Sequence, residues 1–300
     1  MPGSTQTSAI YWGSAASGSF ADTARWADGL APGAAHIAVF KTAGTFTAAL
    51  AADTANKRLR VRTGTVTLDL AGHTYTLAAT AAERSILVGQ VSGDSASLTF
   101  TGGTVTAVDA SLGEASGATG SLRLTGAGTS LVLSGSLGVG GSPTAAGGSG
   151  TLTVESGTSL QVGGNVKVWG GTFDLAGSLT APGFDLSGGT ISGSSPVTVG
   201  GVSTWTGGTM SGSGTTTIAA NGALTISGAS SKTLGNRTLT NSGSIIHTGT
   251  GSLVGGSGSP AAILNNQALA VYDLQGNTNI SGSIGLRRIW SLINMICDTS

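Results

Sequence analysis

The unit Gly170-Gly171-Thr172-Phe173 recurs along this chain as two glycines, a threonine and an apolar residue. The full copies are Gly102–Val105, Gly170–Phe173, Gly188–Ile191 and Gly207–Met210, and the last three begin 18 and 19 residues apart. Two looser copies fill the long gap after the first, at Gly128–Leu131 and Gly157–Leu160. Turn residues that return at such intervals are typical of a solenoid, which adds one coil for each repeat.

The segments between these glycines alternate between apolar and polar residues, as Val66, Leu68 and Leu70 do with a period of two. Threonine, valine, serine and glycine dominate the sequence, and this mixture favours strands and turns over helices. Apolar residues are expected to face inward, threonine and serine to face outward, and glycine to occupy the bends. We therefore predict an all-β fold, a single-stranded parallel β-helix (β-solenoid) with an N-terminal cap.

Composition excludes several other classes of protein. Glycine accounts for 52 of the 300 residues, but no strict Gly-X-Y period is present, so the chain is not a collagen. Hydrophobic residues make up 39% and are placed periodically, which argues against disorder. A net charge of zero provides no attraction to nucleic acid or to an anionic membrane, and no run of 18 apolar residues predicts a membrane-spanning helix.

Metal and cofactor sites are not indicated either. Cys297 is the single cysteine, so it forms no internal disulfide and no metal site alone, and the three histidines are widely scattered. The segment Gly147–Leu152 begins like a calcium-binding solenoid turn but has threonine and leucine where aspartate is required. We expect no cofactor and no metal.

Three regions are expected. Residues 1–60 hold Trp12, Trp26 and Phe20 and are expected to form an aromatic cap that merges into the first coil, because an open solenoid end invites aggregation. Residues 61–285 are expected to form the repeats, with an insertion at Ser142–Gly148 that bulges from a corner. Residues 286–300 lack glycine and are strongly apolar; we expect either a capping helix or a foreign tail.

The stretch Trp26–Gly33, followed by Ile37–Phe40, resembles the start of large bacterial autotransporter-type passenger proteins, and Val66–Leu77 does so as well. The units Leu137–Gly140 and Gly150–Val154 are similar to their passenger-associated β-helix repeats. This resemblance implies a right-handed parallel β-helix, export, and an extracellular or cell-surface location. The first twenty residues lack a secretory signal pattern, so we expect a passenger fragment whose leader and anchor are absent.

Asp174 and Asp185 sit in matched contexts, each between a phenylalanine and a leucine. Two carboxylates on one β-helix face are suited to binding Ca²⁺ or to acid–base chemistry on a polysaccharide. The alternative, which we favour, is two solvated outward positions of a repeat.

Trp169 and Trp205 each lie close before a Gly-Gly-Thr unit, in coils expected to be neighbours. Facing outward, they would form a stacking platform for sugar rings; we favour burial or partial burial in the core. The run Lys57–Arg62 is the densest basic patch, and alternation places three arginines on one face. A solvated face is favoured there over an anion site.

The leading hypothesis for function is a non-enzymatic passenger, a structural stalk or adhesin, with ligands among host or matrix glycans or surface proteins. It is expected to be a monomer. One alternative is a carbohydrate-active β-helix enzyme, a polysaccharide lyase or hydrolase, which requires clustered carboxylates beside a basic residue. A phage tail-spike segment, which would form a trimer, is the other.

Overall fold

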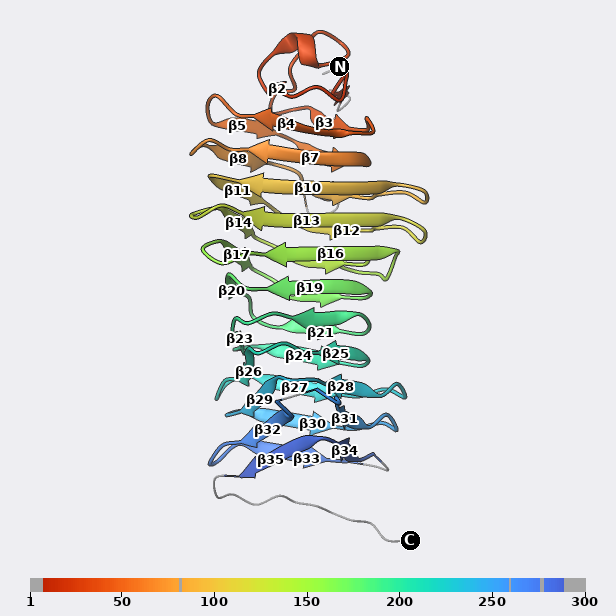
Figure 1. Ribbon diagram of the computed structural model, residues 1–300, viewed down its shortest axis with the longest axis vertical. Coiled ribbons are helices and arrows are strands. Elements are labelled where there is room, and N and C mark those ends of the chain that lie inside the picture. Colours follow the sequence, from red (N-terminus) through yellow and green to blue (C-terminus); the bar gives the residue numbers. More distant parts are fainter. Residues whose placement is uncertain (1–7, 81–82, 259, 276–277, 289–300) are drawn as a thin grey trace, which may run out of the picture.

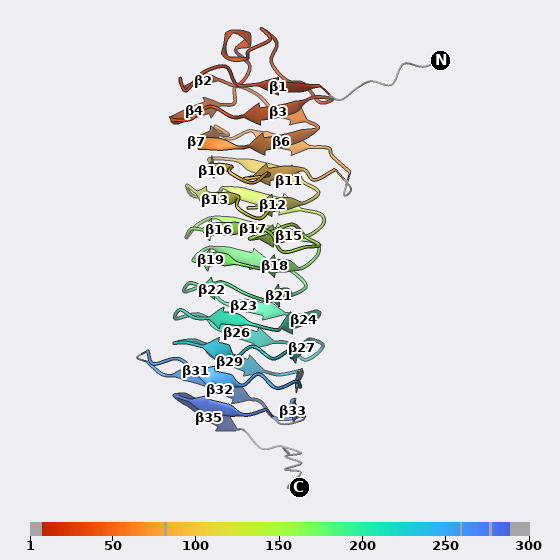
Figure 2. The same ribbon diagram turned by 90° about the vertical axis from the view of Figure 1, so that its right-hand side faces the viewer.

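In the computed structural model the chain is a single-stranded parallel β-helix, described for residues 8–80, 83–258, 260–275 and 278–288. Each complete coil contributes one strand to each of three faces, and the coils stack along one axis from the N-terminal to the C-terminal end (Figures 1 and 2). All strand pairs in the four sheets are parallel. At the usual spacing of about 4.8 Å between strands, twelve coils form a rod of roughly 50–60 Å.

Two of the faces are continuous sheets of twelve strands. Sheet 1 comprises β1 (Ala9–Tyr11), β3 (Ile37–Phe40), β6 (Arg58–Val61), β9 (Ile86–Val88), β12 (Ala110–Leu112), β15 (Leu137–Val139), β18 (Val166–Val168), β21 (Phe184–Leu186), β24 (Val202–Trp205), β27 (Ala223–Ile226), β30 (Ser244–His247) and β33 (Val271–Leu274). Sheet 2 comprises β2 (Gly18–Ser19), β4 (Thr45–Ala49), β7 (Thr63–Asp69), β10 (Ser95–Thr101), β13 (Thr119–Thr125), β16 (Ser149–Val154), β19 (Gly171–Leu175), β22 (Thr190–Ser192), β25 (Gly208–Met210), β28 (Lys232–Leu234), β31 (Leu253–Gly255) and β34 (Ile280–Gly282).

The third face is divided into two sheets that do not pair with each other. Sheet 3a comprises β5 (Thr54–Asn56), β8 (Thr74–Leu77), β11 (Thr104–Ala107), β14 (Ser130–Leu133), β17 (Ser159–Val162) and β20 (Ser178–Thr180). Sheet 3b comprises β23 (Val197–Val199), β26 (Thr215–Ile218), β29 (Thr238–Asn241), β32 (Ala262–Asn266) and β35 (Ile284–Arg288). The division falls between two consecutive coils and is the main irregularity of the rod.

Strand register explains the repeating unit. Thr172, Thr190 and Thr209 pair in sequence, so the copies at 170, 188 and 207 stack as one column at the start of sheet 2 strands. The copy at 102 lies at a different corner, because Thr104 opens a strand of sheet 3a and pairs with Ser130 of a looser copy. The same tetrapeptide therefore occurs at two different corners of the coil.

The core is a set of inward columns, as the alternation predicts. In sheet 2 the column through Val66, Leu98 and Leu122 continues through Phe173, and these side chains are at most 1% exposed. Burying side chains of this size contributes about 1.5–3 kcal/mol each. Because each coil contributes the next residue of every column, the core grows with the rod.

An aromatic cluster closes the N-terminal end. The rings of Trp12 and Trp26 meet edge to face at 5.0 Å, and Phe46 stacks on Trp12 at 6.0 Å. The indole N–H of Trp26 donates to the Phe20 carbonyl at 2.8 Å, which fixes the loop around the 3₁₀ turn η1 (Thr23–Arg25). Regular pairing starts within this region, because β1 already pairs with β3.

At the other end of the rod the strand pairing reaches into the expected tail. Residues 286–288 continue β35 and pair with Leu264, Asn265 and Asn266 of β32, so they are not the start of a helix. The remainder of the tail lies outside the described residues.

Candidate functional site

The most distinctive surface feature is the break between β20 and β23. Two of the chain's six prolines flank it: Pro196 directly precedes β23, and Pro182 follows β20. Proline has no backbone N–H and therefore cannot contribute a donor to a ladder. The coils rejoin on both sides, since Ser195 donates its N–H to Leu175 O at 3.1 Å and Gly201 donates to Pro182 O at 2.8 Å. The break is thus confined to one short stretch of one face.

A groove of about 540 Å³ lies at this break. Its lining is uncharged, with the hydroxyls of serine and threonine beside alanine, leucine, proline and glycine. The lining residues are Gly157, Thr158, Ser159, Ala176, Gly177, Ser178, Leu179, Ser195, Pro196 and Thr198. Such a surface is suited to a neutral ligand that makes hydrogen bonds and apolar contacts.

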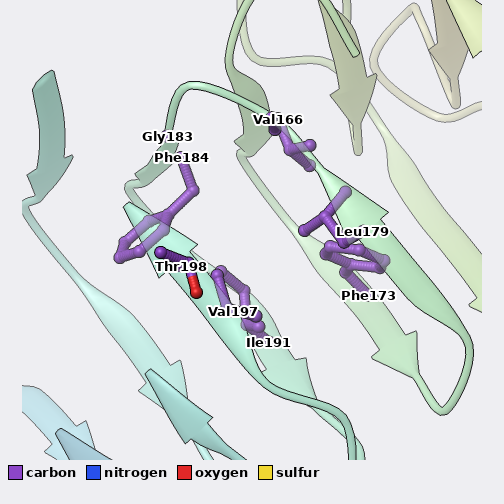
Figure 3. A pocket seen from close by; sticks show the side chains of 9 residues that line it. Val166, Phe173, Leu179, Gly183, Phe184, Ile191, Val197 and Thr198 are labelled. Carbon is purple, nitrogen blue, oxygen red and sulfur yellow. The ribbon is translucent and has the colours of Figure 1, made fainter. Parts of the chain in front are cut away.

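Beneath the groove, a small apolar cavity of about 10 Å³ reaches the core. Figure 3 shows Leu179 and Phe173 on one side of it and Ile191, Val197 and Thr198 on the other. Leu179 and Thr198 line both the cavity and the groove. A space of this size with an apolar lining is expected to stay dry, so it marks incomplete packing at the break.

The two tryptophans considered as a possible sugar platform lie apart. Trp205 is fully buried and continues an inward column after Leu186, with its indole N–H left without a hydrogen-bond partner. Trp169 is half-buried at a corner and donates its indole N–H to Ser142 O at 2.8 Å. The expectation that they occupy neighbouring coils is wrong, because β21 lies between β18 and β24 in sheet 1. The side chains do not form a joint platform, as the favoured burial implies.

The two aspartates lie on different faces. Asp174 is in β19 of sheet 2, where it accepts a hydrogen bond from Ser192 Oγ at 3.1 Å. Asp185 is in β21 of sheet 1, where Lys167 Nζ lies 3.3 Å away and Thr204 Oγ1 donates at 2.9 Å. Carboxylates on separate faces cannot act together on one bond, so the two aspartates do not form the joint carboxylate site that was weighed against two outward positions.

The basic run near the cap is partly neutralised by acidic side chains. Arg62 pairs with Asp94 at 2.9 Å, and Lys57 pairs with Glu83 at 2.5 Å. Hydrogen bonding to Asp94 raises the pKa of Arg62, and the Lys57 ammonium holds the pKa of Glu83 at about 2. Arg60 differs from these two residues: its Nε is buried without a partner, and burial lowers its pKa. Ion pairing thus occupies Lys57 and Arg62, whereas Arg58 donates its Nε–H to Arg84 O at 2.8 Å.

Sequence analysis did not predict a buried polar cluster near the C-terminal end. Lys232 is fully buried and donates to Gly228 O at 3.2 Å and Gly251 O at 3.3 Å. His247, also fully buried, contacts Tyr272 Oη at 3.1 Å and Gly251 O at 3.2 Å. Burial lowers the pKa of both Lys232 and His247.

One buried arginine has every donor matched. Arg237 is 1% exposed, and its guanidinium reaches Thr216 Oγ1 at 2.8 Å together with the carbonyl oxygens of Gly193, Ser195, Ser211 and Thr215. Its carbonyl partners lie in the bends of the two preceding coils, so Arg237 connects three consecutive coils by hydrogen bonds beside the break.

Within the described part of the chain, no three or more His, Cys, Asp or Glu side chains are grouped to hold a metal ion. No helix in the same residues is both long and apolar enough to span a membrane. Comparison with family models, with curated proteins and with solved structures finds no match to this chain. The groove at the break is consequently the feature on which a binding role is best argued.

Proposed function

We propose that this chain is a non-enzymatic β-helix passenger, a structural stalk or adhesin-like segment displayed outside the cell or at its surface. The observation that carries the proposal is the continuous core of sheets 1 and 2 over twelve coils, which makes a rod rather than a globular cleft. A solenoid of this kind extends a binding surface at a fixed distance, because each coil contacts only its neighbours. The resemblance to autotransporter-type passengers supports the same role and location.

The distribution of charge also favours this role over an enzyme. Asp174 and Asp185 lie on different sheets, and the lining of the groove at the break carries no carboxylate or basic side chain. A glycoside hydrolase usually needs two carboxyl groups within about 5–10 Å of each other across the scissile bond. Binding to host or matrix glycans or surface proteins requires only the exposed hydroxyl-rich surface.

The test uses purified chain on arrays of glycans and matrix proteins, together with a panel of polysaccharides assayed for new reducing ends and unsaturated sugars. We expect binding without product release, and light scattering is expected to give a monomer. Product release that is lost in Asp185→Asn or Asp174→Asn would transfer the proposal to a carbohydrate-active enzyme. A stable trimer would favour a tail-spike segment.

A further inference from the structure

We propose that the outer face of β1, β3 and β6 binds an acidic glycan, whose carboxylate or sulfate groups contact Arg58 and Arg60. The inference rests on the proposed function, because it names a ligand class for a chain displayed outside the cell. It concerns the basic run Lys57–Arg62, for which the sequence left an anion site open beside a solvated face. The groove at the break is a separate surface and is suited to a neutral ligand.

Strand register places cations side by side on this face. Arg58 and Arg60 are alternate residues of β6, so their side chains leave the same outer face of the sheet about 6.5 Å apart. Lys41 follows β3 beside Arg62, because Arg62 N–H donates to Phe40 O at 2.8 Å. The strands β1, β3 and β6 stack one after another next to the N-terminal end (Figure 2). The face therefore presents cations on two neighbouring coils.

Three of these cations have no carboxylate partner. Within the described residues, Arg60 makes no side-chain hydrogen bond, and Lys41, Arg58 and Arg60 form no ion pair. Arg58 uses only its Nε, which donates to Arg84 O at 2.8 Å, so its terminal nitrogens are available to a ligand. The carboxylates nearby are engaged by other cations in ion pairs. An added anion would therefore not compete with an existing partner.

The two arginines also destabilise each other. Burial lowers the pKa of Arg58, and the neighbouring charge of Arg60 lowers it further. Burial likewise lowers the pKa of Arg60, which is partly exposed but has its Nε enclosed without an acceptor. An oxyanion at the terminal nitrogens of both groups supplies the opposite charge that this face lacks. Guanidinium groups form their strongest hydrogen bonds with such planar or multidentate oxyanions.

An apolar floor beneath the arginines restricts their movement. Val39 and Leu87 flank Arg60 in the outward column, yet they are only 2% and 0% exposed. Ile37 pairs with Arg58 and is 6% exposed. The aliphatic stems of the two arginines are placed to supply part of the cover that these outward positions have. A cation whose stem is already packed loses less conformational freedom when it binds a ligand.

Tyr11 extends this face toward a sugar. It pairs with Val39 in the column that continues to Arg60, so it lies two strand spacings, about 10 Å, from the arginine. Its side chain is exposed. An exposed tyrosine offers an apolar ring face together with a polar tip, which suits a sugar ring. A ring on Tyr11 and the acidic substituent of a following sugar on Arg60 fit an oligosaccharide better than a free inorganic anion.

The probe is a fluorescently labelled, heparin-derived hexasaccharide, titrated with the whole chain at low salt while anisotropy is recorded. A labelled hexagalacturonate supplies carboxylates without sulfates, and labelled cellohexaose supplies neither group. We expect saturable binding of at least one acidic probe with a Kd between about 1 µM and 1 mM, and the stronger of the two identifies the preferred anion. Cellohexaose should not bind in this range, and added salt should weaken the binding of the acidic probe.

A matched set of variants locates the site. Arg58→Gln and Arg60→Gln should each weaken binding about tenfold, through the loss of a charge-assisted contact. Arg123→Gln is the control, because it removes the same charge from an outward position of sheet 2, where Arg123 pairs with Glu155; binding should be unchanged. Tyr11→Ser should weaken binding at least about threefold.

Circular dichroism checks the fold of each variant. If Arg60→Gln does not fold, Arg60→Lys takes its place, because lysine keeps the charge but loses the planar fork, and binding should again be weaker.

Three results would overturn the proposal: no saturable binding of either acidic probe up to about 1 mM, equal binding of cellohexaose, or unchanged binding by the folded arginine variants. Tighter binding of a single-stranded oligonucleotide than of either acidic probe would assign the face to nucleic acid instead. Failure of these titrations leaves the stalk role intact, because that role is tested by arrays of neutral glycans and matrix proteins and by product release.

Discussion

Replacing Arg237 by methionine is expected to destabilise the central coils strongly. The five donors of a guanidinium are matched in this chain by five acceptors, four of which are backbone carbonyls of preceding corners. Methionine fills a similar volume but donates nothing, so carbonyls in a corner with almost no solvent access lose their partner. A buried acceptor left unsatisfied costs about 1–3 kcal/mol. Gly193 O keeps a donor from Gly214 N–H at 3.1 Å, so we expect a total loss of about 3–5 kcal/mol after relaxation.

Lys232→Met is the matched comparison, since it removes the second buried cation from the same coil. Gly228 O keeps a hydrogen bond from Gly251 N–H at 3.0 Å, and Gly251 O keeps one from Thr278 Oγ1 at 3.1 Å. No acceptor is orphaned, and the cost of burying an ammonium, which lowers the pKa of Lys232, disappears. We therefore expect a gain of about 1–2 kcal/mol, opposite in sign to the arginine variant.

Urea unfolding followed by circular dichroism measures both variants, and hydrogen exchange over residues 190–240 shows whether the change is local. Arg237→Lys should fall between wild type and methionine, because it keeps the charge but only three donors. An Arg237→Met variant within about 1 kcal/mol of wild type would refute the account. So would a Lys232→Met variant that loses as much stability as Arg237→Met.

Three further outcomes are expected. Burial lowers the pKa of His247 below its unfolded value of about 6.5. The unfolded chain therefore takes up a proton before the folded chain does, and the free energy of unfolding falls as pH drops below 6.5. The difference in urea midpoint between pH 7.5 and pH 5 should accordingly be smaller in His247→Gln than in the unmodified chain. Gly120→Ala should lower the free energy of unfolding by about 1–3 kcal/mol, because its Cβ would lie 1.9 Å from Val88 O. Gly200→Ala is the control: open space surrounds that position, so the same urea assay should show no change in stability. Trp26→Ala should lower the free energy of unfolding by about 3–5 kcal/mol, because the ring packs against Trp12 and Phe20 in the cap. The same variant should raise the rate of hydrogen exchange in β1 and β3. Unchanged exchange in these strands would contradict a capping role for Trp26.

Much of the fold follows from the sequence for a physical reason. A stack of parallel strands needs a residue with positive φ at each bend, and glycine is the residue that adopts it without strain. Gly171, Gly189 and Gly208 all have φ between 67° and 85°, so their spacing in the sequence gives the coil length directly. Alternation then separates inward from outward positions, as in β10, where alternate residues are buried.

The position of each coil relative to its neighbours was harder to predict. The tetrapeptide at Gly102 and the one at Gly170 are alike in sequence, yet they bend different corners, and the positive φ falls on the first glycine of one (Gly102, 72°) and on the second glycine of the other (Gly171, 85°). Lys232 resembles an outward strand residue in its sequence context. Its pairing with Gly208 and Leu253 places it in an inward corner column, which only the three-dimensional register reveals.

The sequence does contain a signal for the candidate site, in the positions of two prolines. Pro182 and Pro196 stand 14 residues apart in a chain with only six prolines, and this interval contains the change from sheet 3a to sheet 3b. Pro196, directly before β23, lacks the N–H that a ladder bond at that point of the third face would need. The four residues singled out from composition and context, Trp169, Trp205, Asp174 and Asp185, were instead distributed over separate positions by the register.

Coil length varies along the rod and changes abruptly within sheet 1. Paired residues Leu137 and Val166 are 29 positions apart, whereas Val166 and Phe184 are only 18 apart. The long coil holds its extra residues at a corner, where Trp169 contacts Ser142, and the short one leaves the third face incomplete. In a rod with so few free charges, regular coils offer the same hydroxyl-rich surface everywhere and therefore little selectivity. Selective binding then requires a departure from the repeat, and the break between β20 and β23, beside the partly exposed Leu179, is such a departure within the described residues.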